Sequence, residues 1–239
     1  MDREHFDVLI VGAGISGVGG AYHLQTQCPD KSFVILEGLE TFGGTWWTHK
    51  YPGIRSDSDL FTFGYRFKPW IGAPIATADE ILSYMGEVIE ENSIDQHIRY
   101  NHWITRAAWS TEDQRWTIEG ERKDTGESVS FTCNFLWMCQ GYYKHSQGFT
   151  PDWEGMNDYE GQIVHPQTWP EDLDYKGKNV LCIGSGATTA TVVPAMAADC
   201  EHITVLQRSP TYFTPQKNIN ETADHLRKLK IDETWIYYL

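Results

Sequence analysis

The sequence is poor in positive charge, has no paired cysteines and lacks any long apolar run. Its 19 lysine and arginine residues stand against 33 aspartates and glutamates, so the formal net charge is −14 at pH 7. Because nucleic acids and anionic membranes bind basic surfaces, this balance argues against both as partners. No stretch approaches the roughly 20 apolar residues of a membrane helix, and the polar start at residues 1–5 does not resemble a signal peptide. We therefore expect a soluble, cytoplasmic protein with no membrane span.

The cysteines and histidines are not spaced in the patterns typical of disulfide frameworks and metal sites. The cysteines are odd in number and contain no CxxC pair, so we interpret them as reduced structural thiols. The nine histidines show no HExxH or paired-ligand spacing, which predicts that no metal is bound. The five cysteines are Cys28, Cys133, Cys139, Cys182 and Cys200.

The chain does contain two units of strand, glycine loop and helix. The apolar run 6–11 ends at a glycine and predicts a buried strand, followed by a helix over 16–26 and a strand over 32–36. The second unit is predicted as a strand over 179–183, a helix near 187–197 and a strand over 202–207. The predicted fold class is α/β, with two Rossmann-like dinucleotide-binding units in series.

The remaining segments complete this prediction. The stretch 43–70 lacks helical or strand periodicity and is dense in glycine, proline and aromatic residues, which favours an ordered, functional loop. The second unit has two strands and no visible third, so we expect the nucleotide fold to be C-terminally incomplete. We further expect helices over 78–92 and 221–229, a small antiparallel β insertion made of 103–110, 114–120 and 128–133, a separate buried strand over 135–139, and a linker over 144–178.

The first glycine loop, Gly12-Ala-Gly14-Ile-Ser16-Gly17, has the spacing of a dinucleotide site. Gly12 permits the tight turn, Gly14 lets the backbone approach a pyrophosphate, and Gly17 lets the helix pack against the strand. The helix N-terminus that follows offers N–H groups and a positive dipole end to the phosphates. Glu37 stands where a carboxylate would bind ribose hydroxyls. These features together predict dinucleotide binding.

The second loop, Gly184-Ser-Gly186-Ala-Thr188-Thr189, departs from this pattern because Thr189 replaces the third glycine. Thr189 is larger, so we expect the helix to lie slightly farther from the strand. The next strand ends in Arg208-Ser209 instead of an acidic residue, and a cation there favours the 2′-phosphate of NADPH over NADH. The alternative is a surface arginine at a strand end.

Two further motifs are rich in aromatic residues. In the loop 43–57, glycines allow close approach to a ring, Trp46 offers a flat face, and Asp57 is able to accept hydrogen bonds or hold a cation. Taken alone, this segment has the alternative of a packed surface loop. The second motif, 159–170, lies between the two glycine loops. Two nucleotide loops in series with such motifs indicate electron transfer from a nicotinamide to a flavin.

With these motifs the chain resembles a type I Baeyer–Villiger monooxygenase, a class B flavin-dependent monooxygenase. The family pattern GGxWxxxxYPGxxxD is matched from Gly43 to Asp57. The fingerprint FxGxxxHxxxWP is matched at Gly161, His165, Trp169 and Pro170, with Tyr159 in place of phenylalanine. The resemblance covers nearly all of the chain and is to the N-terminal half of such enzymes.

The resemblance implies which residues hold each cofactor. Arg55, Ser56 and Asp57 are expected where the nicotinamide meets the flavin, with Asp57 as the candidate catalytic residue. The fingerprint acts in the family as a hinge between the nucleotide sites, so His165 is not expected to be a proton-transfer base. FAD is expected at Gly12, Gly14, Ser16, Gly17, Glu37, Thr45, Trp46, Asp57 and Ile104, and NADPH at Gly184, Ser185, Gly186, Ala187, Thr188, Thr189, Arg208 and Ser209.

The implied organisation is an FAD-binding domain over 1–143, a linker with the fingerprint over 144–178, and the first part of an NADPH-binding domain over 179–239. The implied activity is an FAD- and NADPH-dependent monooxygenase that uses O2 to transfer one oxygen atom to a ketone or soft heteroatom of a small organic substrate. One alternative is a truncated, inactive fragment that at most binds flavin, and another is an N- or S-oxygenating relative. A flavin disulfide reductase is disfavoured because no redox CxxxxC follows the first unit.

Overall fold

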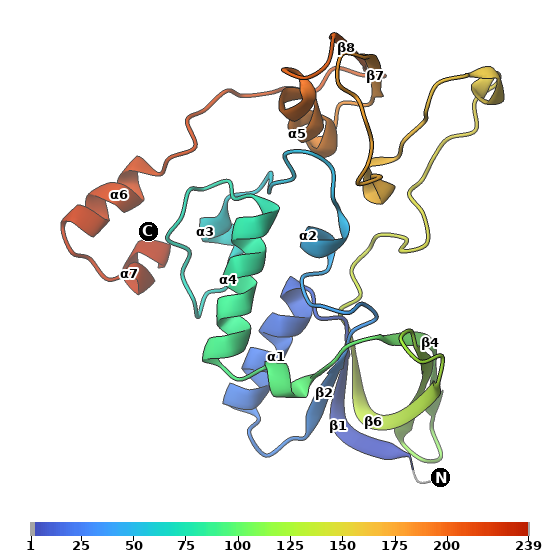
Figure 1. The fold of residues 1–239 in the computed structure, drawn as a ribbon. Coiled ribbons are helices and arrows are strands. Elements are labelled where there is room, and N and C mark those ends of the chain that lie inside the picture. Colours follow the sequence, from blue (N-terminus) through green and yellow to red (C-terminus); the bar gives the residue numbers. More distant parts are fainter. Residues whose placement is uncertain (1–2, 239) are drawn as a thin grey trace. The chain divides into compact units, whose positions relative to one another are not determined.

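The computed structural model describes residues 3–238, and its chain divides into two compact units (Figure 1). The first unit comprises Met1–Thr48 and Leu82–Tyr143, and the second comprises His49–Ile81 and Lys144–Leu239. The aromatic-rich loop after residue 48 therefore groups with the later part of the chain. The expected division into 1–143, 144–178 and 179–239 remains a prediction.

The first unit is built on a six-stranded mixed sheet with the order β3-β2-β1-β6-β5-β4. Strands β1, β2 and β3 are parallel to one another, and β4, β5 and β6 form the antiparallel insertion. Helices α1 and α4 begin and end within one residue of the predicted bounds. The elements are β1 (Glu4–Val11), α1 (Ile15–Gln27), β2 (Phe33–Leu36), α2 (Thr45–Thr48), α4 (Ala78–Glu91, whose first turn falls in the second unit), η1 (Asp95–His97), β3 (Ile98–Arg99), β4 (His102–Ser110), β5 (Arg115–Arg122) and β6 (Ser128–Met138).

Strand β6 corrects one prediction. The sequence suggested two strands, 128–133 and 135–139, but the structure has one continuous strand of 11 residues. Its first half pairs antiparallel with β5, while residues 131–138 pair parallel with β1, so β6 joins the insertion to the parallel sheet. The switch from alternating to continuous apolar residues near Asn134 reflects this change of partner. The later half is also not buried: Phe135 is 58% exposed and Met138 is 50% exposed.

The core of the first unit lies where the parallel and antiparallel parts of the sheet meet. Apolar side chains from β1, β2, β5 and β6 pack into one cluster, which burial of apolar area stabilises. The cluster fixes the strand ends from which the first glycine loop leaves. Its buried members are Leu9, Val34, Leu36, Ile118, Phe131 and Cys133.

The second unit contains a two-stranded parallel sheet, β7 (Asn179–Ile183) and β8 (His202–Leu206), joined by α5 (Ala187–Met196). This confirms the predicted second β–α–β unit, and in the part of the chain that the structure describes its sheet has two strands. Apolar residues of this sheet stay exposed, with Leu181 at 56% and Leu206 at 54%. The other elements are α3 (Leu60–Phe63), η2 (Met156–Asp158), η3 (Pro166–Thr168), α6 (Glu221–Lys228) and α7 (Glu233–Tyr238).

Short helices are the elements that the sequence did not predict. The stretch 43–70 was expected to be irregular, yet it holds the one-turn helices α2 and α3. Helix α3 begins because the Asp59 carboxylate accepts a hydrogen bond from the Phe61 N–H at 2.8 Å, which is an N-cap. One turn is too short to produce a hydrophobic period, so no pattern marked it. Among residues 3–238, no helix is long and apolar enough to cross a membrane.

Candidate functional site

The first glycine loop is closed by contacts that leave no room for side chains. Gly12 has a φ of +103°, and a Cβ there would lie 2.6 Å from the carbonyl oxygen of Cys139. A Cβ at Gly17 would lie 1.9 Å from the carbonyl oxygen of Gly12. Both distances are far below van der Waals contact, so the turn and the packing of α1 require glycine at each position.

The N-terminus of α1 is arranged to receive an anion. Its N-cap is Gly14, which provides no side-chain hydrogen bond, and the first turn contains no acidic residue. A Cβ at Gly44 would lie 3.2 Å from the Cα of Gly14, so two glycine backbones face each other at this point. The positive end of the helix dipole is therefore flanked by bare backbone, which fits a bound pyrophosphate.

Glu37 at the end of β2 supports the same loop. It is only 7% exposed, and its carboxylate accepts hydrogen bonds from the N–H groups of Ala13 at 2.6 Å and Leu39 at 3.0 Å. The carboxylate thus ties β2 to the glycine turn, a structural role that the sequence did not reveal. Each carboxylate oxygen keeps a further lone pair with which it could accept a ribose hydroxyl.

Four more of the residues predicted for FAD also belong to the first unit. Thr45 and Trp46 open α2, where the Trp46 N–H donates to the Gly43 carbonyl at 3.2 Å. Ser16 is exposed in the first turn of α1, and Ile104 on β4 is partly buried against the core cluster. Eight of the nine residues that the resemblance assigned to FAD therefore lie in the first unit, whereas the ninth, Asp57, lies in the second.

The second glycine loop repeats the turn with looser packing. Gly184 has a φ of +126°, but the nearest atom to a Cβ there would be the Thr189 hydroxyl at 3.6 Å. A Cβ at Gly186 would meet nothing within 4 Å. Thr189 fits without a clash, and its hydroxyl accepts a hydrogen bond from the Cys182 thiol at 3.8 Å.

The N-terminus of α5 resembles that of α1. Its N-cap, Gly186, makes no side-chain cap and the first turn has no acidic residue. The Ser185 hydroxyl lies 2.7 Å from the Thr211 hydroxyl, which ties the glycine loop to the segment after β8. Arg208 and Ser209 lie in that segment and are exposed. This arrangement leaves the Arg208 guanidinium accessible to a phosphate.

The later part of the 43–57 motif packs on α5. Gly53 has a φ of +73°, and a Cβ there would lie 2.8 Å from the Cβ of Ala195 and 3.2 Å from the Thr191 carbonyl oxygen. The Tyr51 hydroxyl is hydrogen-bonded to the side chain of Thr188, and burial raises the pKa of Tyr51. Tyr51 and Gly53 therefore hold this loop along the helix of the second glycine loop.

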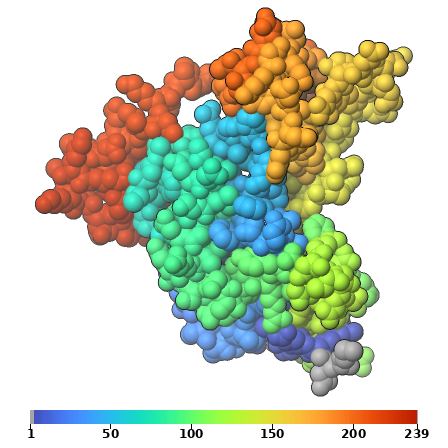
Figure 2. Space-filling view, viewed as in Figure 1, coloured from blue at the N-terminus to red at the C-terminus, as the bar shows by residue number. Residues whose placement is uncertain are grey.

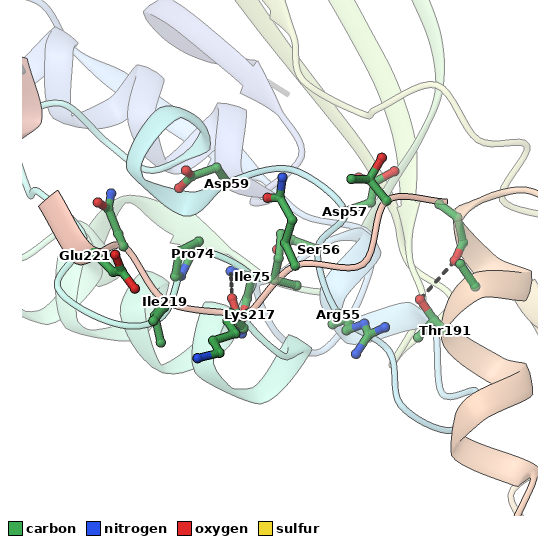
Figure 3. Close-up of a pocket in the computed structure, with 16 residues that line it drawn as sticks. Arg55, Ser56, Asp57, Asp59, Pro74, Ile75, Thr191, Lys217, Ile219 and Glu221 are labelled. Carbon is green, nitrogen blue, oxygen red and sulfur yellow. Dashed lines mark hydrogen bonds between the residues drawn. The ribbon is translucent and has the colours of Figure 1, made fainter. Parts of the chain in front are cut away.

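A pocket of about 880 Å³ opens beside this contact within the second unit (Figure 3). Arg55, Ser56 and Asp57 line it together with Ala187 and Thr191 of α5. The structure thus brings three residues predicted at the nicotinamide together with the start of the predicted NADPH helix. Its remaining lining comes from α5, from the chain between Asp59 and α4, and from the segment that leads into α6: Asp59, Pro74, Ile75, Ala190, Thr214, Gln216, Lys217, Asn218, Ile219, Asn220 and Glu221.

Ser56 and Asp57 differ sharply in their surroundings. Ser56 is 4% exposed, and its hydroxyl accepts a hydrogen bond from the Ala76 N–H at 3.1 Å, while the Ser56 N–H donates to the Ala76 carbonyl at 2.8 Å. Its side chain therefore fixes the loop. Asp57 is exposed, and its carboxylate accepts from the Ser58 hydroxyl at 3.4 Å. Of the two, Asp57 is the side chain available to a bound group.

The fingerprint residues order an irregular segment of the second unit. The His165 Nδ1 accepts a hydrogen bond from the Gln167 N–H at 3.1 Å and so caps η3. A Cβ at Gly148 would lie 2.0 Å from the His165 ring, and one at Gly161 would lie 2.3 Å from the Tyr159 hydroxyl. Trp169 packs edge-on against Tyr175, with ring centroids 6.3 Å apart. These are contacts that shape the backbone.

The sequence missed the contribution of the segment before α6. Residues 214–220 carry no glycine pattern, no periodicity and no charge cluster, so no signal assigned them to a site. Pro170 of the fingerprint, which accepts a backbone hydrogen bond from Leu173 at 3.2 Å, was by contrast found through its motif alone.

Among the described residues, no group of three or more potential metal ligands comes together.

Two family models match the chain. Residues 10–69 match the NAD(P)-binding Rossmann-like domain, and residues 74–218 match the flavin-binding monooxygenase-like family. The FAD-containing monooxygenase EthA of Mycolicibacterium smegmatis is 52% identical over 227 residues, covering 94% of this chain and 46% of that protein. The chain thus spans about half the length of the curated relatives it matches.

Solved structures resemble the chain over a similar range. A steroid monooxygenase bound to NADP matches with a TM-score of 0.76 at 31% identity, covering 94% of this chain and 43% of the other. The OTEMO complex with FAD and NADP matches with a TM-score of 0.72 at 30% identity, covering 88% of this chain and 40% of the other. Since the family match spans more than half of its residues, the chain belongs to the flavin-binding monooxygenase-like family.

Proposed function

We propose that this chain forms the FAD- and NADPH-binding part of a Baeyer–Villiger-type monooxygenase. The reaction uses NADPH and O2 to transfer one oxygen atom to a ketone or soft heteroatom of a small organic substrate. The observation that carries the proposal is the pair of glycine loops, each leading into a helix whose N-terminus has no side-chain cap, with a carboxylate after one and an arginine after the other. Relatives named as FAD-containing monooxygenases support it.

The residues of the first unit fit FAD. The uncapped N-terminus of α1 suits the pyrophosphate, because free N–H groups and the helix dipole stabilise negative charge. Gly12 and Gly17 have no space for a side chain, so the backbone at this turn stays bare. Glu37 holds the loop and keeps lone pairs for the ribose. When bound, FAD supplies the redox and oxygen chemistry, and the protein binds it and excludes water.

The residues of the second unit fit NADPH. The uncapped N-terminus of α5 would hold the pyrophosphate, and Arg208 with Ser209 would hold the 2′-phosphate. The pocket reaches from Ala187 to Arg55 and Asp57, which places the candidate nicotinamide residues on its wall. We assign Asp57 the role of accepting hydrogen bonds from the group bound there, because its carboxylate is exposed and lines the pocket.

The fingerprint is proposed to act as a hinge. His165 caps η3 and packs on Gly148, and both contacts set the course of the backbone. A histidine whose Nδ1 already accepts a backbone N–H is better suited to shaping the chain than to moving a proton. The hinge would also include the other fingerprint residues, Tyr159, Gly161, Trp169 and Pro170.

The proposal is tested by an anaerobic absorbance spectrum of the purified chain with FAD, before and after NADPH is added. A retained yellow complex that NADPH bleaches supports both nucleotide sites, and NADH serves as the matched control for the role of Arg208. A chain that retains no flavin would contradict the proposal.

A second candidate is a flavin-binding module that turns nothing over. The two-stranded β7–β8 sheet, with Leu181 and Leu206 exposed, favours it, because such a sheet buries little apolar area. Flavin that is retained but not bleached by NADPH would support this candidate instead.

A further inference from the structure

The segment Thr214–Glu221, which we call the strap, is held at its middle by one side chain. The Oδ1 of Asn218 accepts a hydrogen bond from the Ile75 N–H at 2.8 Å, and its Nδ2 donates to the Ile75 carbonyl at 2.7 Å. The amide therefore pairs with both polar groups of one residue, as a neighbouring strand would. Such a two-point contact fixes both position and orientation.

Ile75 itself belongs to a backbone that is fixed to the predicted nicotinamide residues. Ser56 and Ala76 exchange hydrogen bonds at 2.8 and 3.1 Å, and Arg55 pairs with Thr77 in an antiparallel bridge. A displacement of Ile75 relative to these residues would break these bonds. Asn218 consequently sets the register of the strap against Arg55 and Ser56.

The strap supplies much of the pocket lining, and Ala187, Ala190 and Thr191 of α5 supply another part. Of the residues that line the pocket, Arg55 and Lys217 are the cations, and Lys217 is adjacent to Asn218. Figure 3 shows Arg55 and Lys217 on one side of the strap and Asp57 and Asp59 on the other. The position of the strap therefore determines where the positive charge of Lys217 lies relative to a bound ligand.

A second set of contacts holds the chain beyond the strap. The Arg227 guanidinium lies over the Phe61 ring at 5.4 Å, pairs with Glu233 at 2.8 Å and donates to the Trp70 carbonyl at 3.4 Å. Figure 2 shows this C-terminal segment, in red, beside the cyan-to-teal surface near residues 60–75. Because α6 is anchored independently, loss of the Asn218 contact should release the strap without detaching the helix.

We propose that Asn218 is a positioning residue for the NADPH pocket. By pairing with Ile75 it keeps the strap in place as the pocket wall and holds Lys217 in the lining, so that NADPH binds to a preformed site. This inference rests on the proposed function, because it assigns the pocket to NADPH. Preformed walls strengthen binding because the ligand need not order them.

The test compares N218A and N218D with the unchanged 239-residue chain, using hydrogen exchange at Ile75 and titration with NADPH. N218A removes both bonds, so it should speed exchange of the Ile75 amide and weaken NADPH binding by roughly 3- to 10-fold, the range of one modest hydrogen bond. N218D keeps the acceptor for the Ile75 N–H but loses the donor to its carbonyl. Its second carboxylate oxygen would face the Ile75 carbonyl oxygen and would add a negative charge to the pocket lining. Exchange at Ile75 should therefore be no faster than in N218A, while NADPH affinity should fall at least as far as in N218A.

The matched control is N92A in the first unit. Asn92 also donates a side-chain hydrogen bond to a backbone carbonyl, that of Val88 at 2.8 Å, but it does not line the pocket. N92A should leave exchange at Ile75 and NADPH affinity unchanged, and FAD retention should be equal in the N218 variants and the unchanged chain.

Two results would overturn the inference. Unchanged exchange at Ile75 in N218A would show that the pair does not hold the strap, and faster exchange with unchanged NADPH affinity would show that the strap is not part of the site. Failure of the unchanged chain to bind NADPH would instead contradict the proposed NADPH site itself, and with it the role of Asn218 there. The two kinds of failure are thus distinguishable.

Discussion

The two glycine loops share a plan of strand, turn and helix but differ in how tightly that plan is packed. In the first, a Cβ at the third position, Gly17, would meet the Gly12 carbonyl at 1.9 Å. In the second, the third position is Thr189, whose side chain fits beside Gly184 and Cys182. The first loop is part of a six-stranded sheet and the second of a two-stranded one. The glycine motif thus specifies the turn, while the surrounding sheet determines how closely the helix packs.

The largest expected difference is between Gly17→Ala and Thr189→Ala. Gly17→Ala forces the Gly12 carbonyl and the start of α1 apart, which should lower the free energy of unfolding by about 3 kcal/mol and abolish FAD retention. Thr189→Ala removes only a weak hydrogen bond and should cost about 1 kcal/mol or less. Urea denaturation followed by tryptophan fluorescence measures the free energy of unfolding of the two variants, and the flavin absorbance of the purified Gly17→Ala chain measures its FAD retention.

A matched addition of one methyl group at an open glycine is the control. Gly186→Ala places its Cβ where nothing lies within 4 Å, so it should be close to neutral for stability. Equal destabilisation by Gly17→Ala and Gly186→Ala would mean that the tight packing of the first loop does not exist in solution.

The first glycine of each loop provides the next comparison. Gly12 and Gly184 both have a positive φ, so alanine at either position should cost about 1–2 kcal/mol in backbone strain. Gly12→Ala adds a clash, because its Cβ would lie 2.6 Å from the Cys139 carbonyl, whereas the nearest atom at Gly184 is 3.6 Å away. The destabilisation should therefore be larger for Gly12→Ala, measured by the same denaturation. Equal losses of stability in Gly12→Ala and Gly184→Ala would mean that backbone strain, and not a clash with the Cys139 carbonyl, causes the destabilisation.

These contrasts show what the sequence could and could not predict. Strands and helices of both β–α–β units followed from apolar runs that end at glycine, as at Gly12 and Gly184. The second role of Glu37, which hydrogen-bonds the Ala13 N–H, was hidden because a motif gives spacing but not hydrogen-bond partners. Asn218 was missed for the same reason, since its partner Ile75 is 143 positions away. Contacts made across long separations leave no local pattern.

The residues that follow β2 and β8 differ in charge, since Glu37 follows the first and Arg208 the second. Replacing each by glutamine tests what its charge contributes. Glu37→Gln leaves an amide facing two backbone N–H groups, so it should cost about 1–3 kcal/mol of stability and weaken FAD binding. Arg208 is exposed, so Arg208→Gln should change stability by about 0.5 kcal/mol or less. It should instead lower the preference for NADPH over NADH by about tenfold.

Denaturation and titration with both nicotinamide cofactors separate these effects. If Arg208→Gln retained its full preference for NADPH, the 2′-phosphate would have to be bound elsewhere. If Glu37→Gln were neutral for both stability and FAD binding, the buried carboxylate would not be holding the first loop.

The last comparison concerns pH and the core of the first sheet. Cys133 is fully buried on β6, and burial raises the pKa of its thiol to about 11, with a hydrogen bond from the Leu9 backbone opposing part of the shift. Below the unfolded value near 9.0, both states keep the proton and pH has no effect through this group. Between that pH and about 11, the unfolded chain loses the proton while the folded chain keeps it. The free energy of unfolding should therefore fall with rising pH, by up to about 1.4 kcal/mol per unit.

Urea denaturation at a series of pH values from 8 to 11 measures this slope, and Cys133→Ala is its control. The variant loses stability at every pH because a buried group is removed, but its loss should shrink as pH rises, since it no longer carries the thiol penalty. Parallel pH profiles for the two proteins would contradict the assignment. They would mean that the Cys133 thiolate is as well accommodated in the folded sheet as in the unfolded chain, and that the first core is less closed to water than its burial indicates.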